Sequence, residues 1–256
     1  MDPLVLVALV VVALVAGFID AIAGGGGLLT VPALMMAGLS PVSAIATNKL
    51  QAVFGTLAAS ITFVRAGRVD LPALMPAILL AALGSGSAAL ALRYVDQSVL
   101  DIAIPILLLG AALYFAFSPR MEDVDKQARL GRMAFALGPA MLIGLYDGAF
   151  GPGAGAFYTL AAVSLLGHGL SRAVGEAKLL NLASNLAALM IFSVGDAVFW
   201  QAGLVMAGAT MVGAWFGARS AITKGSSLIR PVLVVMSFAI AAKLLFDALS
   251  SSGSPS

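Results

Sequence analysis

The chain has 256 residues, of which 61% are hydrophobic and only 10% are charged, and its mean hydropathy is +1.05. About a quarter of the residues in soluble domains are charged, so this composition excludes a soluble globular protein and predicts an all-α, polytopic bundle of transmembrane helices. The net charge of +2 comes without basic runs interleaved with aromatic residues, which excludes nucleic-acid binding, and the lack of cysteine excludes disulfides and thiolate metal sites.

Apolar windows long enough to cross a bilayer, about twenty residues, predict the spans in chain order. They are residues 4–23, 41–64, 71–92, 97–117, 133–150, 170–194, 197–218 and 228–249. The first is interpreted as a retained span, because Met1-Asp2-Pro3 lacks the positive region of a signal peptide. Two shorter apolar segments, 28–38 and 153–166, follow glycine runs and are predicted to be second pieces of broken helices or arms of re-entrant hairpins.

A polar linker, residues 119–132, separates a first transmembrane repeat, 1–118, from a second, 133–249, and residues 250–256 form a tail expected to be disordered. The halves would be parallel repeats with an even number of crossings each and inverted repeats with an odd number. Basic residues are spread almost evenly over the two sides, which leaves only a lean toward a cytoplasmic linker. Several arginines are interpreted as interface anchors, namely Arg65, Arg68, Arg93, Arg219 and Arg230.

An acidic residue, a glycine run and a lysine recur in that order in both halves. Asp20 precedes Gly24–Gly27, Asp147 precedes Gly151 and Gly153, and Lys49 and Lys178 follow about twenty-five residues after the glycines. Four consecutive glycines would cost a continuous helix several kcal/mol, at about 1 each, so a helix break is predicted. By contrast, Gly213 and Gly217 are attributed to close helix packing.

Ionisable groups within spans are expensive and point to function, although a buried structural ion pair is the alternative for each lysine and its aspartate. Helix starts freed at the breaks, glycines that admit a ligand and one lysine from each half predict an anion site. A cation site is the alternative, because the breaks also free carbonyl groups. The candidate substrate-binding residues are Gly24, Gly25, Gly26, Gly27, Thr47, Asn48, Lys49, Gln51, Gly151, Gly153, Lys178, Asn181 and Asn185. The candidates for ion coupling or ion pairing are Asp20, Asp147 and Glu176.

No catalytic or nucleotide-binding motif is found, so we expect neither an enzyme nor a cofactor or metal site. The single histidine, His168, is interpreted as a loop residue between Gly167 and Gly169. Transport would then be driven by a gradient of ions or of the substrate.

The doubled motif resembles the TauE/SafE family of sulfite exporters. The first half of that family is similar to the segments Gly17–Gly27, with Pro32, and Ala46-Thr47-Asn48-Lys49. The second half is similar to Gly148–Gly153 and Gly175-Glu176-Ala177-Lys178, with the amides Asn181 and Asn185. The resemblance implies a multi-pass transporter of the bacterial inner membrane for sulfite, sulfonates or related small anions. Glu176 departs from the threonine that the family often has before the lysine segment, which alters the expected charge preference.

We therefore expect a secondary membrane transporter of small anions, coupled to an ion gradient. An anion channel with a fixed pore and a membrane structural subunit without transport are the alternatives. The expected partners are a small anionic substrate and membrane lipid, with no nucleic acid, and a homodimer is left open. The substrate, the direction of transport and the coupling ion are left open as well.

Overall fold

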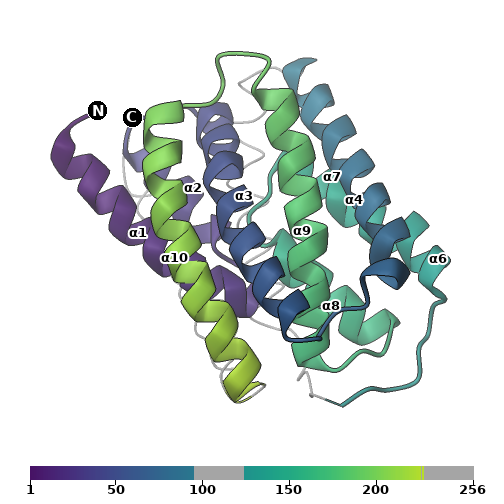
Figure 1. Cartoon of the computed structure of the whole chain (residues 1–256). Helices are drawn as coiled ribbons and strands as arrows, with labels where there is room; N and C mark the ends of the chain where they lie inside the picture. Colours follow the sequence, from purple (N-terminus) through teal and green to yellow (C-terminus); the bar gives the residue numbers. More distant parts are fainter. Residues whose placement is uncertain (95–123, 226, 228–256) are drawn as a thin grey trace, which may run out of the picture.

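The computed structural model describes residues 1–94, 124–225 and 227, and this part of the chain is helical with no strand (Figure 1). The elements are α1 (Pro3–Ala23), α2 (Gly27–Met36), α3 (Pro41–Arg65), α4 (Leu71–Ala91), η1 (Leu92–Tyr94), α6 (Arg132–Phe135), η2 (Ala136–Ala140), α7 (Met141–Ala149), α8 (Ala154–Leu165), α9 (Leu170–Phe192) and α10 (Trp200–Lys224). The predicted spans 97–117 and 228–249, residues 119–123 of the predicted linker and the tail 250–256 lie outside the described residues.

The remaining predicted spans match helices to within two residues at each end, except that α10 begins three residues later and ends six residues later than the predicted span 197–218. Local signals fix the starts of the first and third helices. Asp2 and Ser40 cap α1 and α3 by accepting hydrogen bonds from the main-chain N–H of Leu4, at 2.7 Å, and of Ser43, at 3.3 Å. In both helices a proline occupies the first turn, where its missing N–H is not needed. The window 133–150 is less regular than predicted: residues 136–140 form a π-helical turn that contains Pro139, since proline cannot donate the usual helical hydrogen bond.

Among the described helices, α1 and α4 are long and apolar enough by themselves to cross a membrane. The long helices α3 and α9 carry buried lysines, amides and hydroxyl groups, which lowers their apolar content. These polar side chains face neighbouring helices, so the interior of the bundle is where its polar groups gather.

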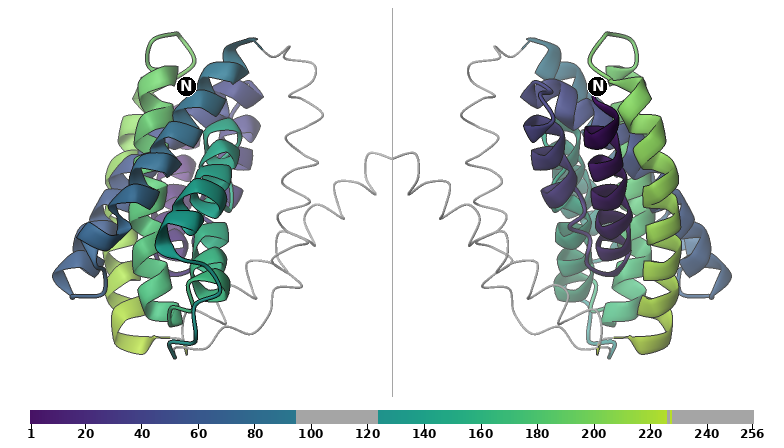
Figure 2. Two further views of the ribbon diagram at one scale, coloured as in Figure 1. Left: turned by 90° about the vertical axis from the view of Figure 1, so that its right-hand side faces the viewer. Right: turned by 90° about the vertical axis from the view of Figure 1, so that its left-hand side faces the viewer.

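The long helices form a connected series in which α1 packs on α10, α10 on α3, α3 on α9, and α9 on α4, and the shorter α7 packs on α4. Figure 1 shows α3 and α9 in the middle of this series, and Figure 2 shows the same arrangement from the two sides. The short helices α2 and α8 pack against α3 and α9. A Cβ atom at Gly213 or Gly217 would overlap the main chain of α1, which confirms that these two glycines serve close helix packing.

Both predicted helix breaks are confirmed. After α1, Gly24 has φ 80° and α2 begins three residues later at Gly27; after α7, Gly151 and Gly153 have φ 90° and 84° before α8 begins. Such positive φ angles are the region that glycine adopts at no steric cost. The two breaks touch, since the Ala156 N–H donates to the Gly24 carbonyl at 3.2 Å. Whether the halves superpose as parallel or inverted repeats stays a prediction.

Candidate functional site

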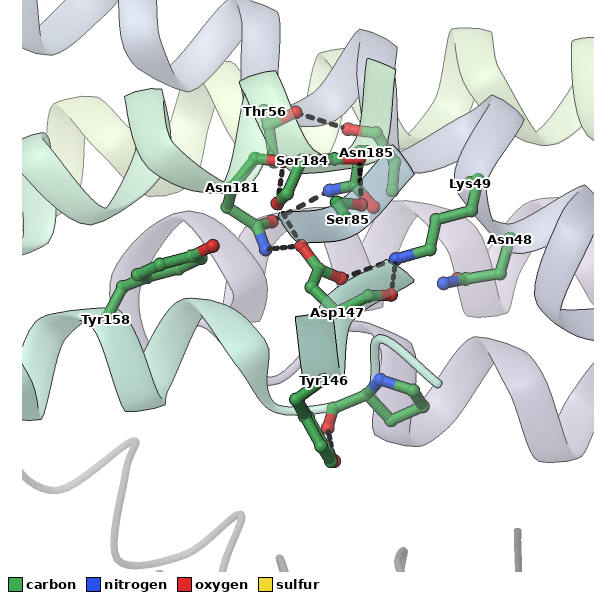
Figure 3. A network of polar contacts seen from close by, with 12 residues as sticks. Asn48, Lys49, Thr56, Ser85, Tyr146, Asp147, Tyr158, Asn181, Ser184 and Asn185 are labelled. Carbon is green, nitrogen blue, oxygen red and sulfur yellow. Dashed lines mark hydrogen bonds and ion pairs between the residues drawn. The ribbon is translucent and has the colours of Figure 1, made fainter. Parts of the chain in front are cut away.

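The first buried ion pair joins α3 to the end of α7. Lys49 Nζ donates hydrogen bonds both to the carboxylate Oδ1 of Asp147 and to the main-chain carbonyl of the same residue (Figure 3). The Lys49 side chain is 0% exposed and that of Asp147 is 1% exposed. The ammonium group thus sits at the C-terminal end of α7, where the helix dipole favours a cation.

The second ion pair joins α9 to the end of α1 with the same set of contacts. Lys178 Nζ lies 3.0 Å from Oδ2 of Asp20 and also donates to the main-chain carbonyl of Asp20. Lys178 is 0% exposed, whereas the Asp20 side chain is 20% exposed. In both cases the lysine of one half of the chain pairs with the aspartate of the other half.

The two aspartates differ in their remaining hydrogen bonds. The second carboxylate oxygen of Asp147 accepts from Asn181 Nδ2 at 3.0 Å and from the Ser184 hydroxyl (Figure 3). The free oxygen of Asp20 instead accepts the main-chain N–H of Gly26 at 3.1 Å. The carboxylate of Asp147 is therefore held by side chains inside the bundle, while that of Asp20 is held by the glycine run of its own break.

Amides and hydroxyl groups extend each pair into a wider network. Asn185 donates to Asn181 at 3.0 Å, and the Ser85 hydroxyl donates to the Ser184 carbonyl at 2.6 Å, which ties α4 to α9. On the other side, Asn48 accepts from Thr30 at 2.5 Å and from Gln51 at 2.7 Å. Gln51 in turn accepts a hydrogen bond from Thr210 of α10. These bonds satisfy polar groups that would be costly to leave unpaired inside the bundle.

Glycines line the place where the two breaks meet; Gly27 and Gly151 were predicted for the site, and Gly155 was not. A Cβ atom added to Gly151 would lie 2.7 Å from Lys49 Nζ, and one added to Gly155 would lie 3.3 Å from Lys178 Nζ. A Cβ at Gly27 would come within 3.1 Å of Pro152 in the opposite break. Gly25 is buried as well, and its carbonyl accepts the N–H of Leu28 at 3.1 Å. Glycine is thus required because side chains and backbone of the other half approach this closely.

Two predicted residues have contacts away from the ion pairs. The Thr47 hydroxyl accepts the main-chain N–H of Phe199 at 2.9 Å, so it holds the start of α10. Glu176 is buried near the N-terminal end of α9, where Oε2 lies 2.6 Å from His168 Nδ1 and Oε1 accepts from Arg172 Nε at 3.0 Å. Glu176 is thus engaged at the start of α9, while Lys178 contacts Asp20. The interpretation of His168 as a loop residue is incomplete, because its ring is packed against this carboxylate with only 14% of the side chain exposed.

Several network residues were not predicted. They are Thr30, Ser85, Ser184 and Thr210, together with His168. Ser184 follows Asn181 by three residues and so lies on the same face of α9, which is a signal that the sequence does contain. Within the described residues, no three His, Asp or Glu side chains come together as a metal site would require.

The arrangement leaves both lysines neutralised. With their side chains fully buried and each paired to a carboxylate, neither ammonium group is open to an external anion in this conformation. Separating one pair would uncover a cation and a carboxylate in the low-dielectric interior, where an unpaired charge costs several kcal/mol. A ligand that takes the place of one partner would offset that cost.

Comparisons with known proteins cover almost the whole chain. The family model described as "Sulfite exporter TauE/SafE" matches residues 9–244. The "Probable membrane transporter protein YfcA" of Escherichia coli strain K12 is 47% identical over 246 residues, which is 96% of this chain and 91% of that protein. A "Probable membrane transporter protein" of Haemophilus influenzae is 44% identical over 236 residues, with 92% of each chain covered. A third relative, from Sinorhizobium, is named "Probable membrane transporter protein ORF9" and is 44% identical over 239 residues, 93% of this chain and 92% of that protein.

No solved structure matches the chain. The family model spans far more than half of the chain, and the matched range includes both helix breaks and both ion pairs described above. The chain therefore belongs to the sulfite exporter TauE/SafE family.

Proposed function

We propose that the protein is a secondary transporter of a small anion, with sulfite or a sulfonate as the favoured substrate, that crosses a bacterial inner membrane several times. Membership of the TauE/SafE family and the names of the relatives support membrane transport rather than catalysis. The observation that carries the proposal is the pair of buried lysine–aspartate contacts at the meeting point of two broken helices. Charged groups at such a position within a membrane protein favour a substrate or ion pathway.

Charge balance explains how an anion is accommodated there. Each pair is neutral, so a monoanion that enters alone would leave a net negative charge in a low-dielectric site. If the aspartate takes up a proton as the anion arrives, the carboxyl group becomes neutral and the lysine is free to bind the anion. One proton moves with one negative charge, and the site stays neutral throughout. A dianion would be balanced in the same way by protons on both aspartates.

The unequal exposure of the aspartates assigns an order to these steps. Asp20 is 20% exposed and Asp147 only 1%, although both lysines are fully buried. A proton therefore reaches the Asp20 carboxylate more readily than that of Asp147 in this conformation, which favours the Asp20–Lys178 pair as the first to open. The Lys49–Asp147 pair would open only after the helices around the breaks have moved, as alternating access requires.

A flux assay in proteoliposomes tests the proposal. Purified protein is reconstituted with labelled sulfite, thiosulfate, sulfoacetate or acetate outside, and uptake is followed with an inward proton gradient and again after a protonophore has removed it. We expect saturable uptake of at least one sulfur oxyanion or sulfonate, and a loss of accumulation with the protonophore. Empty liposomes and acetate uptake provide the controls.

The same assay separates the alternatives. A channel would give fast flux that does not saturate and never exceeds equilibrium, with or without the proton gradient. A structural subunit would give no flux above that of empty liposomes for any anion tested. A cation site would show as uptake that follows the cation supplied rather than the anion.

A further inference from the structure

A long groove runs along the outer surface between α3 and α10, apart from the ion pairs. The two helices are in close contact at Gly55 and Thr210, where a Cβ atom on the glycine would overlap the threonine side chain. The groove opens on the C-terminal side of this contact. The C-terminal ends of the two helices lie at the same end of the molecule in Figure 1. The groove has a volume of about 940 Å³ and is lined by residues of α3 from Leu57 to Arg65, by Ala66 directly after it, and by residues of α10 from Met211 to Thr223.

The wall of the groove is apolar along most of its length. Ile61, Met211 and Phe216 are 43%, 44% and 53% exposed, and Leu57 and Val212 are exposed to a similar degree. Because α10 contributes residues over about 18 Å of its length, at 1.5 Å per residue, the groove is long enough for much of an acyl chain. Apolar side chains with this exposure in a membrane protein fit hydrocarbon rather than water.

Two cations lie at the end of this apolar wall. Arg65 is the last residue of α3 and Arg219 lies near the end of α10, and both line the groove. Within the described ranges of the chain, no carboxylate pairs with either guanidinium group. Arg219 lies over the ring of Trp215, with Cζ 4.0 Å from its centroid, which is an arrangement typical of the membrane interface.

The geometry points to a binding site for one anionic diacyl phospholipid, whose acyl chain lies in the groove while its phosphate contacts Arg65 and Arg219. The length and apolar wall of the groove match the acyl chain. The two guanidinium groups, which have no carboxylate partner among the described residues, match a phosphate, to which arginine binds through two parallel hydrogen bonds. A zwitterionic lipid would fill the same groove without the net charge that two cations select.

Tryptophan quenching by brominated lipids tests this site directly, because the sequence contains only two tryptophans and one lies in the groove. In a Trp200→Phe background, Trp215 reports on the groove, and in a Trp215→Phe background, Trp200 near the start of α10 is the matched control. Each protein is reconstituted with dibrominated phosphatidylglycerol or dibrominated phosphatidylcholine. One basic residue near an anionic surface contributes about 1 kcal/mol, a factor of about five, so we expect at least a fivefold preference for phosphatidylglycerol at Trp215.

The preference should fall to about one in the double variant Arg65→Gln/Arg219→Gln and remain in Arg68→Gln, an exposed arginine that does not line the groove. Trp200 should show no preference. Glycerol phosphate without acyl chains should not compete, which distinguishes a lipid from a free phosphate. Equal quenching of Trp215 by both lipids, or a preference that survives the double substitution, would overturn the inference. Protection of Trp215 from both lipids would overturn it as well, because protein from this chain or from a second copy would then cover the groove.

Discussion

Asp147→Asn should destabilise the protein far more than the loss of an exposed ion pair. The substitution leaves the Lys49 ammonium with a main-chain carbonyl but without a negative charge, at a side chain that is 0% exposed. Breaking a buried pair by removing one partner costs about 3–5 kcal/mol, because the remaining charge is buried and uncompensated. Two hydrogen bonds add to the loss, since Asn181 and Ser184 both donate to Oδ2 of Asp147. In the asparagine variant an amide nitrogen, which accepts no hydrogen bond, can take the place of that oxygen.

The double variant Lys49→Met/Asp147→Asn separates charge from packing. It removes both charges, and replacing a whole buried pair is often close to neutral. We therefore expect it to recover at least about 2 kcal/mol of the loss caused by Asp147→Asn. The matched control is Arg132→Gln, which breaks the pair between Arg132 and Asp70, where the atoms are 3.8 Å apart and the side chains 61% and 48% exposed. This control should change stability by less than about 1 kcal/mol.

Equilibrium unfolding of the detergent-solubilised protein by sodium dodecyl sulfate, followed by circular dichroism, measures these free energies. A cost for Asp147→Asn as small as that for Arg132→Gln would show that the Lys49 ammonium is not confined to a buried pair. A double variant that is as unstable as Asp147→Asn alone, or less stable, would contradict the charge coupling between Lys49 and Asp147.

Asp20→Asn should cost less unfolding free energy than Asp147→Asn in the same titration. Both variants leave a buried lysine, but only Asp147 also accepts from two buried side chains, and the site of Asp20 is 20% exposed; an equal cost would contradict this difference in environment. Gly24→Ala should sharply lower the yield of folded protein in size-exclusion chromatography, since φ is 80° and a Cβ atom would overlap the main chain of α8. The control Gly38→Ala, at φ 93° with no neighbour within 4 Å, bears only the backbone strain. Similar yields of the two variants would refute the close contact of the two breaks. Gly148→Ala should lower the melting temperature because its Cβ atom would overlap the backbone of Ser85, and Gly208→Ala, in open space on α10, should be neutral or stabilising by up to about 1 kcal/mol.

Much of the fold follows from local sequence signals. Apolar windows place α1, α3, α4 and α9 to within two residues and α10 less closely, and prolines mark the starts of α1, α3 and α4. The run Gly24–Gly27 marks the first break. These features depend on propensity and burial along one segment of the chain, which a sequence displays directly. The irregular turn at 136–140 was missed, because Pro139 inside an apolar window gives no indication whether the helix ends or bends.

The partners of the charged residues could not be predicted in the same way. The repeat indicates that Lys49 and Lys178 need carboxylates, but the choice of the aspartate from the other half depends on how the halves pack. Hydroxyl groups such as those of Ser184 and Thr210 are common inside helices, so only tertiary structure reveals which carboxylate or amide they reach. Around Glu176, only the pair with Arg172 has a local sign, because four residues separate the two on one face of α9. The contact of Glu176 with His168 becomes visible only in the structure.

Counterflow of a labelled sulfur oxyanion or sulfonate through the neutral double variant Lys49→Met/Asp147→Asn distinguishes a substrate site from a structural ion pair most directly. The protein is reconstituted at equal folded amounts, checked by size-exclusion profile, beside wild type and Arg132→Gln. We expect the double variant to fold and to lose at least about tenfold in exchange rate, the equivalent of 1.4 kcal/mol, while Arg132→Gln exchanges like wild type. Wild-type exchange by a folded protein that lacks both charges would contradict anion binding at Lys49.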